Sequence, residues 1–584
     1  MRYSVYIIYF VFFLTPFLTN GQEKEYVLHL QSQQEIPESI QKKYHRIHGD
    51  SLYITEKMSR LLQDFYALGF LAASIDHLHF AADTAHVQLY CGDKYYRGTI
   101  DYSKLDRPIK EQVAMRSNRK KKRVFQLSEI LALKEQIISA YENSGYPFAS
   151  LTFEPIRFED SLIHFKINPT KNDFYRMDSI LVKGDAKITP YYLYRYIQIK
   201  PGNVFNQKKI NEIDQRIDNL NFLSAIKPAE IEFKEKNADI YLYLKKQKAN
   251  TFNGIIGFLP ENETTGKLLV TGDLNLNLVN SFGRGEELFL QWEKLESSTQ
   301  KLDLHFGYPY LFRTNLGVDG NFELYKKDSS YLSISTGIGL GIMLDYNRSL
   351  RGYYRYKNSS RIGNRLPSTE MRYADIQSNI FGVSFQFSQL DYTFNPRKGV
   401  SLNIYGGAGF KNLGNTQPIT DSLNINPDHK MVEIDAGMDL KIYYPLYERF
   451  VLHFSNTTRY LDQFADKGKE TVFFENELYR FGGSGSLRGF DENIFNASIY
   501  SLQNIEIRYL FEQNAAFYLF WNGAYYYKNV TNDVTEDFPW GFGIGADFET
   551  NAGIFSISYA LGKQFDNPLE IRSAKIHVGY VSRF

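Results

Sequence analysis

The carboxyl-terminal half of this chain constrains its fold most strongly. From residue 248 to the end, sixteen segments of alternating apolar and polar residues follow one another, separated by turn residues. The spacing is roughly 21 residues for a strand with its loop, in line with tilted membrane strands of about 9 to 11 residues. A soluble β-sandwich of this length would be unusual, so the pattern predicts a closed, antiparallel, 16-stranded transmembrane β-barrel. Examples of the segments are residues 268–278, 287–293, 301–308, 332–343, 400–410, 432–443 and 451–460.

The composition favours β-structure and excludes several classes of function. The chain has 44 Tyr and 45 Phe among 584 residues, and aromatic residues are enriched in strands. Its 67 Lys and Arg balance 66 Asp and Glu, which argues against a nucleic-acid partner. The single cysteine, Cys91, cannot form an intramolecular disulfide. The sequence shows no phosphate loop, no nucleophile elbow and no metal-ligand spacing among its 11 His, so we expect no enzyme, cofactor or metal site.

The amino-terminal residues are typical of a secretory signal peptide. Arg2 precedes an apolar run over residues 5–18, and small or polar residues follow up to Gly21. This run is shorter than the roughly 20 apolar residues that a membrane-spanning helix needs. We therefore expect a signal peptide over residues 1–21, and membrane insertion through strands alone.

Between the signal peptide and the barrel, helix-like and strand-like patterns alternate. Apolar residues at helical spacing over 54–68 are followed by Gly69, and the same pattern over 127–141 is followed by a short loop with Gly145. The two glycines are 76 residues apart, which indicates a duplicated module. A third unit follows before the barrel. The predicted boundaries of the modules and the barrel are residues 22–103, 104–173, 174–247 and 248–584.

The third unit carries a resemblance to a known module. A strand over 175–184 precedes helical stretches with an apolar face, and strands near 229–233 and 238–244 complete the unit. This order of strand, helix, helix, strand and strand resembles a POTRA domain, the periplasmic module of the BamA/TamA superfamily. The first two modules resemble it more loosely. The resemblance implies α+β periplasmic domains in front of the barrel.

A glycine-rich segment over residues 481–490 is the most specific motif. It reads Phe-Gly-Gly-Ser-Gly-Ser-Leu-Arg-Gly-Phe, and it resembles the motif that the BamA/TamA superfamily places in a loop folded into the barrel lumen. Weaker similarities at 280–286, 391–399 and 541–560 occur in the expected order, so the resemblance covers residues 174–584. The candidate residues of the loop are Gly482, Gly483, Leu487, Arg488, Gly489 and Phe490.

An arginine at the tip of such a loop needs a partner inside the lumen. The alternation places Glu506 on the lumen face of one strand and Asn522 on the lumen face of the next. They lie 7 residues before and 9 residues after Gln513, so they stand at similar height and are candidate anchors for Arg488. The family usually has Asp at the second position. Asn522 therefore leaves Glu506 as the charged partner.

The resemblance implies an outer-membrane protein assembly or insertion factor. Its POTRA domains would receive unfolded outer-membrane proteins by strand addition, and its barrel would open between the first and last strands. The candidate seam contains Gly254, Gly257, Gly579 and Phe584, because glycines and the nearby Pro260 weaken strand pairing. Outer-membrane lipid and accessory lipoproteins are further candidate partners. A secretion pore of the two-partner type is the alternative, and a passive porin accounts for neither the docking domains nor the loop.

Overall fold

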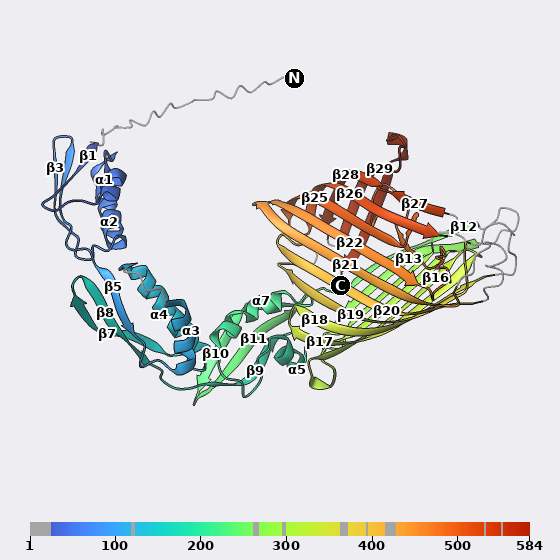
Figure 1. The fold of residues 1–584 in the computed structure, drawn as a ribbon, viewed down its shortest axis with the longest axis horizontal. Helices are drawn as coiled ribbons and strands as arrows, with labels where there is room; N and C mark the ends of the chain where they lie inside the picture. The colour runs from blue at the N-terminus through green and yellow to red at the C-terminus, as the bar shows by residue number, and fades with distance from the viewer. Residues whose placement is uncertain are drawn as a thin grey trace, which may run out of the picture. The chain divides into compact units, whose positions relative to one another are not determined.

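The structure, a computed structural model, describes residues 25–117, 123–260, 268–294, 299–362, 372–392, 395–414, 428–530, 533–550 and 553–583. They form three small modules followed by a closed antiparallel barrel (Figure 1). One compact unit holds the first two modules, and a second holds the third module and the barrel. The expected signal peptide lies outside the described residues. Among the described residues, no helix has the length and hydropathy needed to cross a membrane.

The first module is a four-stranded sheet covered by helices on one face. Its elements are β1 (Tyr26–Ser32), α1 (Glu38–Tyr44), β2 (His48–Gly49), α2 (Ser51–Ala67), β3 (Ser74–Ala81) and β4 (Thr84–Tyr90). The strand order is β2-β1-β4-β3, with β1 parallel to β4. The Asp50 carboxylate accepts the Tyr53 backbone N–H and caps the start of α2. Gly69, at φ +91°, follows its end.

The second module has the same plan. Its elements are β5 (Tyr96–Asp101), α3 (Arg107–Ser117), β6 (Arg123–Val124), α4 (Leu127–Glu142), β7 (Ser150–Glu159) and β8 (Leu162–Thr170). The strand order is β6-β5-β8-β7, and β5 pairs in parallel with β8. Because β5 belongs to this sheet, the second module begins before residue 104, the boundary that the sequence predicted. The paired residues Tyr96 and Leu162 are 66 residues apart in sequence, and local patterns do not reveal such pairing.

The third module contains a three-stranded sheet in the order β10-β11-β9. Its elements are β9 (Arg176–Gly184), α5 (Pro190–Tyr196), α6 (Gln207–Asn211), α7 (Ile213–Asp218), β10 (Leu223–Lys234) and β11 (Asn237–Lys246). The chain therefore follows the expected order of strand, helices, strand and strand. Ile210, Ile213 and Ile217 are buried, as their helical spacing predicts.

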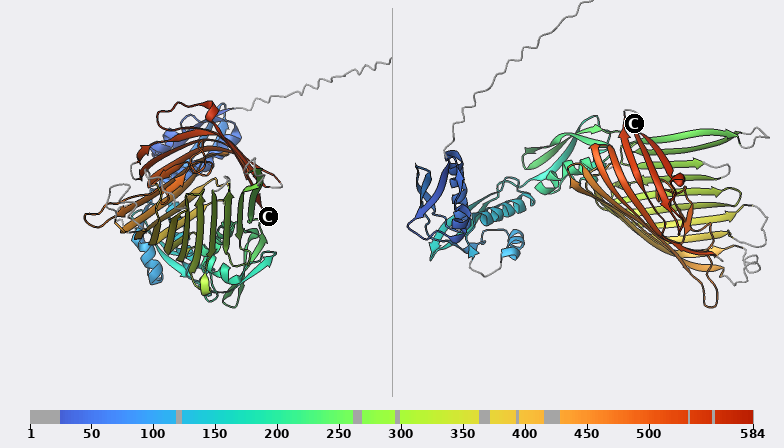
Figure 2. Two further views of the ribbon diagram at one scale, coloured as in Figure 1. Left: turned by 90° about the vertical axis from the view of Figure 1, so that its right-hand side faces the viewer. Right: turned by 90° about the horizontal axis from the view of Figure 1, so that it is seen from above.

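The barrel strands follow one another in chain order, and the predicted fold class is confirmed. Their bounds are β12 (Thr251–Pro260), β13 (Leu268–Val279), β14 (Glu287–Lys294), β15 (Gln300–Tyr308), β16 (Leu316–Lys327), β17 (Tyr331–Asp345), β18 (Arg348–Arg361), β19 (Ile376–Leu390), β20 (Gly399–Leu413), β21 (Lys430–Tyr447), β22 (Phe450–Phe464), β25 (Ile499–Glu512), β26 (Ala515–Val530), β27 (Asp533–Asp537), β28 (Trp540–Glu549), β29 (Ile554–Lys563) and β30 (Lys575–Arg583). Short 3-10 turns at Leu311–Arg313 and Ile571–Ser573 lie between strands. Both β27 and β28 pair with β26 and count as one spanning strand, so the described residues form sixteen. Figure 2 shows the end of β30 beside the first barrel strands, where β30 pairs with β12.

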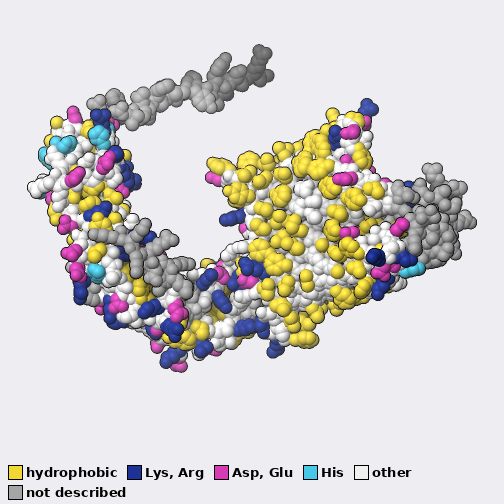
Figure 3. Space-filling model, in the orientation of Figure 1, with side chains coloured by type: hydrophobic (Ala, Val, Ile, Leu, Met, Phe, Trp, Pro, Cys, Tyr) yellow, Lys and Arg dark blue, Asp and Glu magenta, His cyan; other side chains and the backbone are white. Residues whose placement is uncertain are grey.

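The outer surface of the barrel is apolar. In β17, Ile338, Leu340 and Ile342 alternate with glycines and are 47% to 61% exposed. Phe381 and Val383 of β19 are exposed in the same way. Figure 3 shows such side chains covering the visible face of the barrel. Alternate exposure of large apolar residues is what a lipid-facing strand requires.

Candidate functional site

The segment between β22 and β25 carries the predicted loop motif. Two short strands, β23 (Tyr479–Phe481) and β24 (Phe495–Ala497), pair as an antiparallel hairpin, and the motif lies between them. Leu487 is fully buried in a cluster with Phe481, Phe495 and Tyr500. The ring of Phe490 packs edge-on against Phe495 at 5.1 Å between centroids. These apolar contacts hold the loop against the inner wall.

Glycines allow the loop backbone to turn and to approach the wall. Gly482 and Gly483 have φ values of +123° and +90°, which favour glycine. At Gly489, an added Cβ would lie 2.7 Å from the backbone nitrogen of Gly562. At Gly541, an added Cβ would lie 2.3 Å from the Arg488 carbonyl oxygen. Gly541 of β28 pairs with Gly562 of β29. The loop backbone therefore packs directly against the barrel wall at this pair of glycines, where no side chain intervenes.

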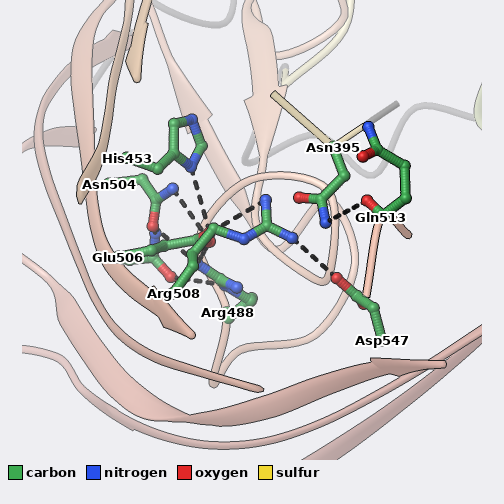
Figure 4. A network of polar contacts seen from close by, with 9 residues as sticks. Asn395, His453, Arg488, Asn504, Glu506, Arg508, Gln513 and Asp547 are labelled. Carbon is green, nitrogen blue, oxygen red and sulfur yellow. Dashed lines mark hydrogen bonds and ion pairs between the residues drawn. The ribbon is translucent and has the colours of Figure 1, made fainter. Parts of the chain in front are cut away.

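Arg488 is the polar anchor of the loop (Figure 4). Its Nε donates to Asn522 Oδ1 at 2.9 Å. Its Nη2 donates to Asn504 Oδ1 and to Glu506 Oε1, each at 2.7 Å. The guanidinium also lies over the ring of Phe520, 3.5 Å from the centroid. Arg488 is 9% exposed, so these contacts replace its water.

The carboxylate of Glu506 belongs to a wider charged network (Figure 4). Its Oε2 lies 3.1 Å from His453 Nδ1 and 4.0 Å from Arg508 Nη1. Arg508 in turn donates to Asp547 at 2.9 Å. The His453 ring stacks on Tyr443, with 4.4 Å between centroids. Two arginines are therefore balanced by two carboxylates, as burial of such charges requires.

The structure brings both predicted anchors, Glu506 and Asn522, onto Arg488. They are not directly opposite, however, because β25 and β26 pair Asn504 with Asn522 and Glu506 with Phe520. An irregularity in the pairing between Leu510 and Glu512 sets this register. Asn504, which also accepts from Arg488, was not among the predicted anchors.

Two members of the network were missed from the sequence. His453 lies opposite Glu506 because of the register between β22 and β25. Asp547 reaches Arg508 from β28. Both come from strands that are distant in sequence, and neither lies in a motif. A signal for them would have required knowledge of the strand register.

A second buried anchor holds the chain just before the hairpin. Lys411 of β20 is fully buried, and its Nζ donates to Gln463 Oε1 at 2.8 Å, Val472 O at 3.1 Å and Glu477 Oε1 at 2.8 Å. Glu477 Oε1 also accepts the backbone N–H of Phe474 at 2.6 Å. This buried ion pair fixes the segment to the inner wall.

Neighbouring residues extend this second anchor. The Asn476 side chain donates to the Ala374 carbonyl and to Ser359 Oγ, both at 2.8 Å. The Tyr479 hydroxyl donates to Asp435 on β21. The segment 472–490 therefore has two sets of polar contacts. The first joins it to the wall around β18 to β22, and the second joins Arg488 to β25 and β26.

The contact between the first and last strands is the shortest in the barrel. Among the described residues, β12 and β30 share two residue pairs, Thr251 with Arg583 and Phe252 with Ser582. The other neighbouring strands share between seven and fifteen pairs. The exception is β26, which shares eight pairs with β28 and five with β27. The barrel closes, but its closing seam is short.

The predicted seam residues are distributed along these two strands. Gly254 and Gly257 follow the paired end of β12, and each pairs with β13. Gly579 pairs with Ser556 of β29. Phe584 lies outside the described residues. As expected from its missing N–H, Pro260 is the last residue of β12.

The family follows from a match to more than half of the chain. The model of the Omp85 superfamily domain matches residues 280–580. The chain belongs to the Omp85 superfamily. The POTRA model, described as a surface antigen variable number repeat, matches residues 175–246 of this Omp85 protein. These matches confirm the resemblance to the BamA/TamA superfamily and the POTRA-plus-barrel architecture.

The chain is similar in sequence to one curated protein and similar in fold to two solved structures described below. The protein is 25% identical over 209 residues to the "Putative outer membrane protein assembly factor" of Treponema pallidum (strain Nichols), which covers 35% of this chain. The chain spans 25% of the length of that relative. CdiB from Escherichia coli has a TM-score of 0.53 at 14% identity, covering 91% of this chain and 98% of its own. CdiB from Acinetobacter baumannii gives 0.51 at 13%, covering 94% and 100%. The CdiB structures share the fold.

The assignment also settles localisation and general class. This Omp85 protein is located in the outer membrane, and its POTRA domains lie in the periplasm. Proteins of this type are non-enzymatic factors for assembly or transport.

Proposed function

We propose that this Omp85 protein is an assembly factor that inserts outer-membrane proteins through the seam between β12 and β30. Unfolded outer-membrane proteins are the proposed clients, received on the POTRA domains by strand addition. The observation that carries the proposal is the seam of two residue pairs. The name of the Treponema relative agrees with this function.

Because the seam is short, lateral opening requires little free energy. Two antiparallel residue pairs carry about two backbone hydrogen bonds, which contribute about 1 to 3 kcal/mol in total. Opening between any other two neighbours breaks several times as many. The edges that an open seam exposes need hydrogen-bond partners within the membrane. An incoming strand supplies them, so strand addition at β12 or β30 is the favoured next step.

The lumen loop braces the strands on one side of the seam. Arg488 joins the loop to β25 and β26 through its side chain. Gly489 lies against β29, and the Arg488 carbonyl lies against Gly541 of β28. Asp491 accepts from Lys575 Nζ of β30 at 2.6 Å. The loop therefore contacts the strands up to and including β30. We propose that this brace keeps the carboxyl-terminal wall rigid while β12 moves away.

A secretion pore of the two-partner type is the competing proposal. A polypeptide that crosses the lumen would have to displace segment 472–490, including the buried pair Lys411 and Glu477. Losing one partner of such a pair costs about 3 to 5 kcal/mol. The lateral route leaves both anchors intact, and it is the route we favour. Outer-membrane lipid and accessory lipoproteins remain proposed partners.

A disulfide across the seam tests the lateral route. The Phe252→Cys and Ser582→Cys pair, in a Cys91→Ser background, places cysteines at directly facing residues. Facing residues in antiparallel strands have Cα atoms about 4.5 to 5.5 Å apart, within the range that a disulfide spans. We expect oxidation to block insertion of a client barrel into liposomes, and reductant to restore it.

A matched crosslink controls for the effect of the bond itself. Ser556→Cys and Gly579→Cys face each other across β29 and β30, beside the seam. We expect this oxidised pair to retain activity, because the neighbouring seam can still open. Full activity of the verified seam crosslink would overturn the lateral route. Depletion of the protein then separates the two functions, since an assembly factor affects many barrels and a secretion pore one exported protein.

A further inference from the structure

The first module carries a row of histidines on the open face of its sheet. His29 of β1 pairs with His86 of β4, and His79 of β3 pairs with the same His86 from the other side. Because β4 lies between β1 and β3, the three side chains stand side by side. The adjacent residues Leu28 and Val87 point to the opposite face and enter the core. Figure 3 shows histidines gathered on the surface of this module.

Two rings of the row are spaced nearly as two ligands of one metal ion would be. The rings of His29 and His86 have centroids 5.7 Å apart. Two imidazoles on one tetrahedral zinc ion, with Zn–N bonds of about 2.0 to 2.1 Å, have centroids roughly 5 Å apart. Small side-chain rotations therefore suffice to bring both rings onto one ion. His79 flanks His86 on the other side at cross-strand distance, where Cβ atoms lie about 4.5 to 5.5 Å apart.

The rings are accessible and are not used elsewhere. His29 and His79 are exposed, and His86 is partly exposed. Among the described residues, none of the three takes part in a hydrogen bond or ion pair, and the contact between His29 and His86 is between rings. Six of the 11 histidines in the chain lie between residues 29 and 86. Imidazole nitrogens are preferred ligands of zinc and related ions.

We propose that His29, His86 and His79 bind a divalent transition-metal ion of the zinc class on this periplasmic module. Among the described residues, no three His, Cys, Asp or Glu side chains are already placed around a metal position. The site is therefore built on His29 and His86, with His79 reaching the ion by rotation and water completing the coordination. The ion would tie together β1, β4 and β3. Binding to the folded sheet alone stabilises the module.

Titration of the untagged full-length protein with Zn²⁺ in detergent tests the site. We expect saturable binding of about one ion per chain by calorimetry. His86→Gln should weaken binding by at least tenfold because it removes the central ligand, and His29→Gln should do the same. His79→Gln should have a smaller effect. The exposed positions of these side chains permit substitution without loss of the fold, which circular dichroism checks.

Two controls make the result specific. His45 is exposed in the same module but lies outside the row, so His45→Gln should bind as the parent does. Mg²⁺ prefers oxygen ligands and should not compete. The proposal is overturned if the parent shows no saturable Zn²⁺ binding, if the His29→Gln, His86→Gln double variant binds like the parent, or if Mg²⁺ competes equally.

Discussion

Replacing Arg488 by alanine tests whether its contacts dock the lumen loop. The guanidinium donates to Glu506, Asn504 and Asn522 at 2.7 to 2.9 Å and is 9% exposed. Removing one partner of a buried ion pair costs about 3 to 5 kcal/mol. His453 remains beside Glu506 and reduces the cost of leaving this carboxylate without its arginine. We therefore expect loop docking to weaken by about 3 kcal/mol, the lower end of this range.

This loss is large enough to measure in the intact protein. A change of about 3 kcal/mol shifts the ratio of docked to undocked loop roughly a hundredfold. Ala497 of β24 is fully buried while the loop is docked. With Ala497→Cys as the probe in a Cys91→Ser background, Arg488→Ala should react much faster with a maleimide. The heat-dependent shift on gels should not change, because the barrel keeps its strand pairing, and client insertion should fall.

A second arginine provides the control. Arg459 donates to both carboxylate oxygens of Asp439 on the neighbouring strand, at 2.8 and 3.1 Å. Arg459→Ala removes an ion pair from the wall but leaves the contacts of Arg488 in place. Its labelling rate should match the parent. An unchanged labelling rate in Arg488→Ala, or an equal increase in Arg459→Ala, would refute the assignment of Arg488 as the anchor.

The other contacts of the loop segment can be tested in parallel. Lys411→Met should destabilise the barrel by about 3 kcal/mol or more because it leaves Glu477 buried without its cation, and the double variant with Glu477→Leu should recover part of the loss in a heat-modifiability series. If the double variant is as unstable as the sum of the single variants, the pair is not coupled. Gly541→Ala should displace the loop, since its Cβ would lie 2.3 Å from the Arg488 carbonyl, and should increase labelling at the Ala497 probe. Gly406→Ala is the control, because an added Cβ there meets no atom within 4 Å, and it should not increase labelling. Equal labelling of the Gly541→Ala and Gly406→Ala variants would show that docking of the loop does not need the glycine at 541.

The barrel illustrates what local sequence patterns can predict. Each example segment chosen by alternation lies within one strand, and 432–443, for instance, lies within β21. The period of two residues arises within a single strand, because successive side chains point to opposite faces. The alternation also placed Glu506 and Asn522 on the inner face, from which both reach Arg488. Such features need no knowledge of a distant partner.

Local patterns could not predict the register between strands, which decides which residues face each other. The sequence predicted Glu506 and Asn522 at similar height, whereas the pairing irregularity near Leu510 places Asn504 opposite Asn522. His453 reaches Glu506 from the other neighbouring strand. A shift of one residue in either pairing would turn these side chains to the lipid face. The composition of the network therefore depends on pairings between separate strands.

The sequence by itself determined the order of modules and barrel, the glycine-rich loop and the inward position of its anchors, because each is a local pattern. Only the tertiary structure decided the two-pair seam and the histidine row. His29, His79 and His86 show no metal-ligand spacing along the chain, yet two strand pairings align them. The physical reason is that hydrogen bonding between strands fixes which residues face each other, and that choice depends on the whole sheet.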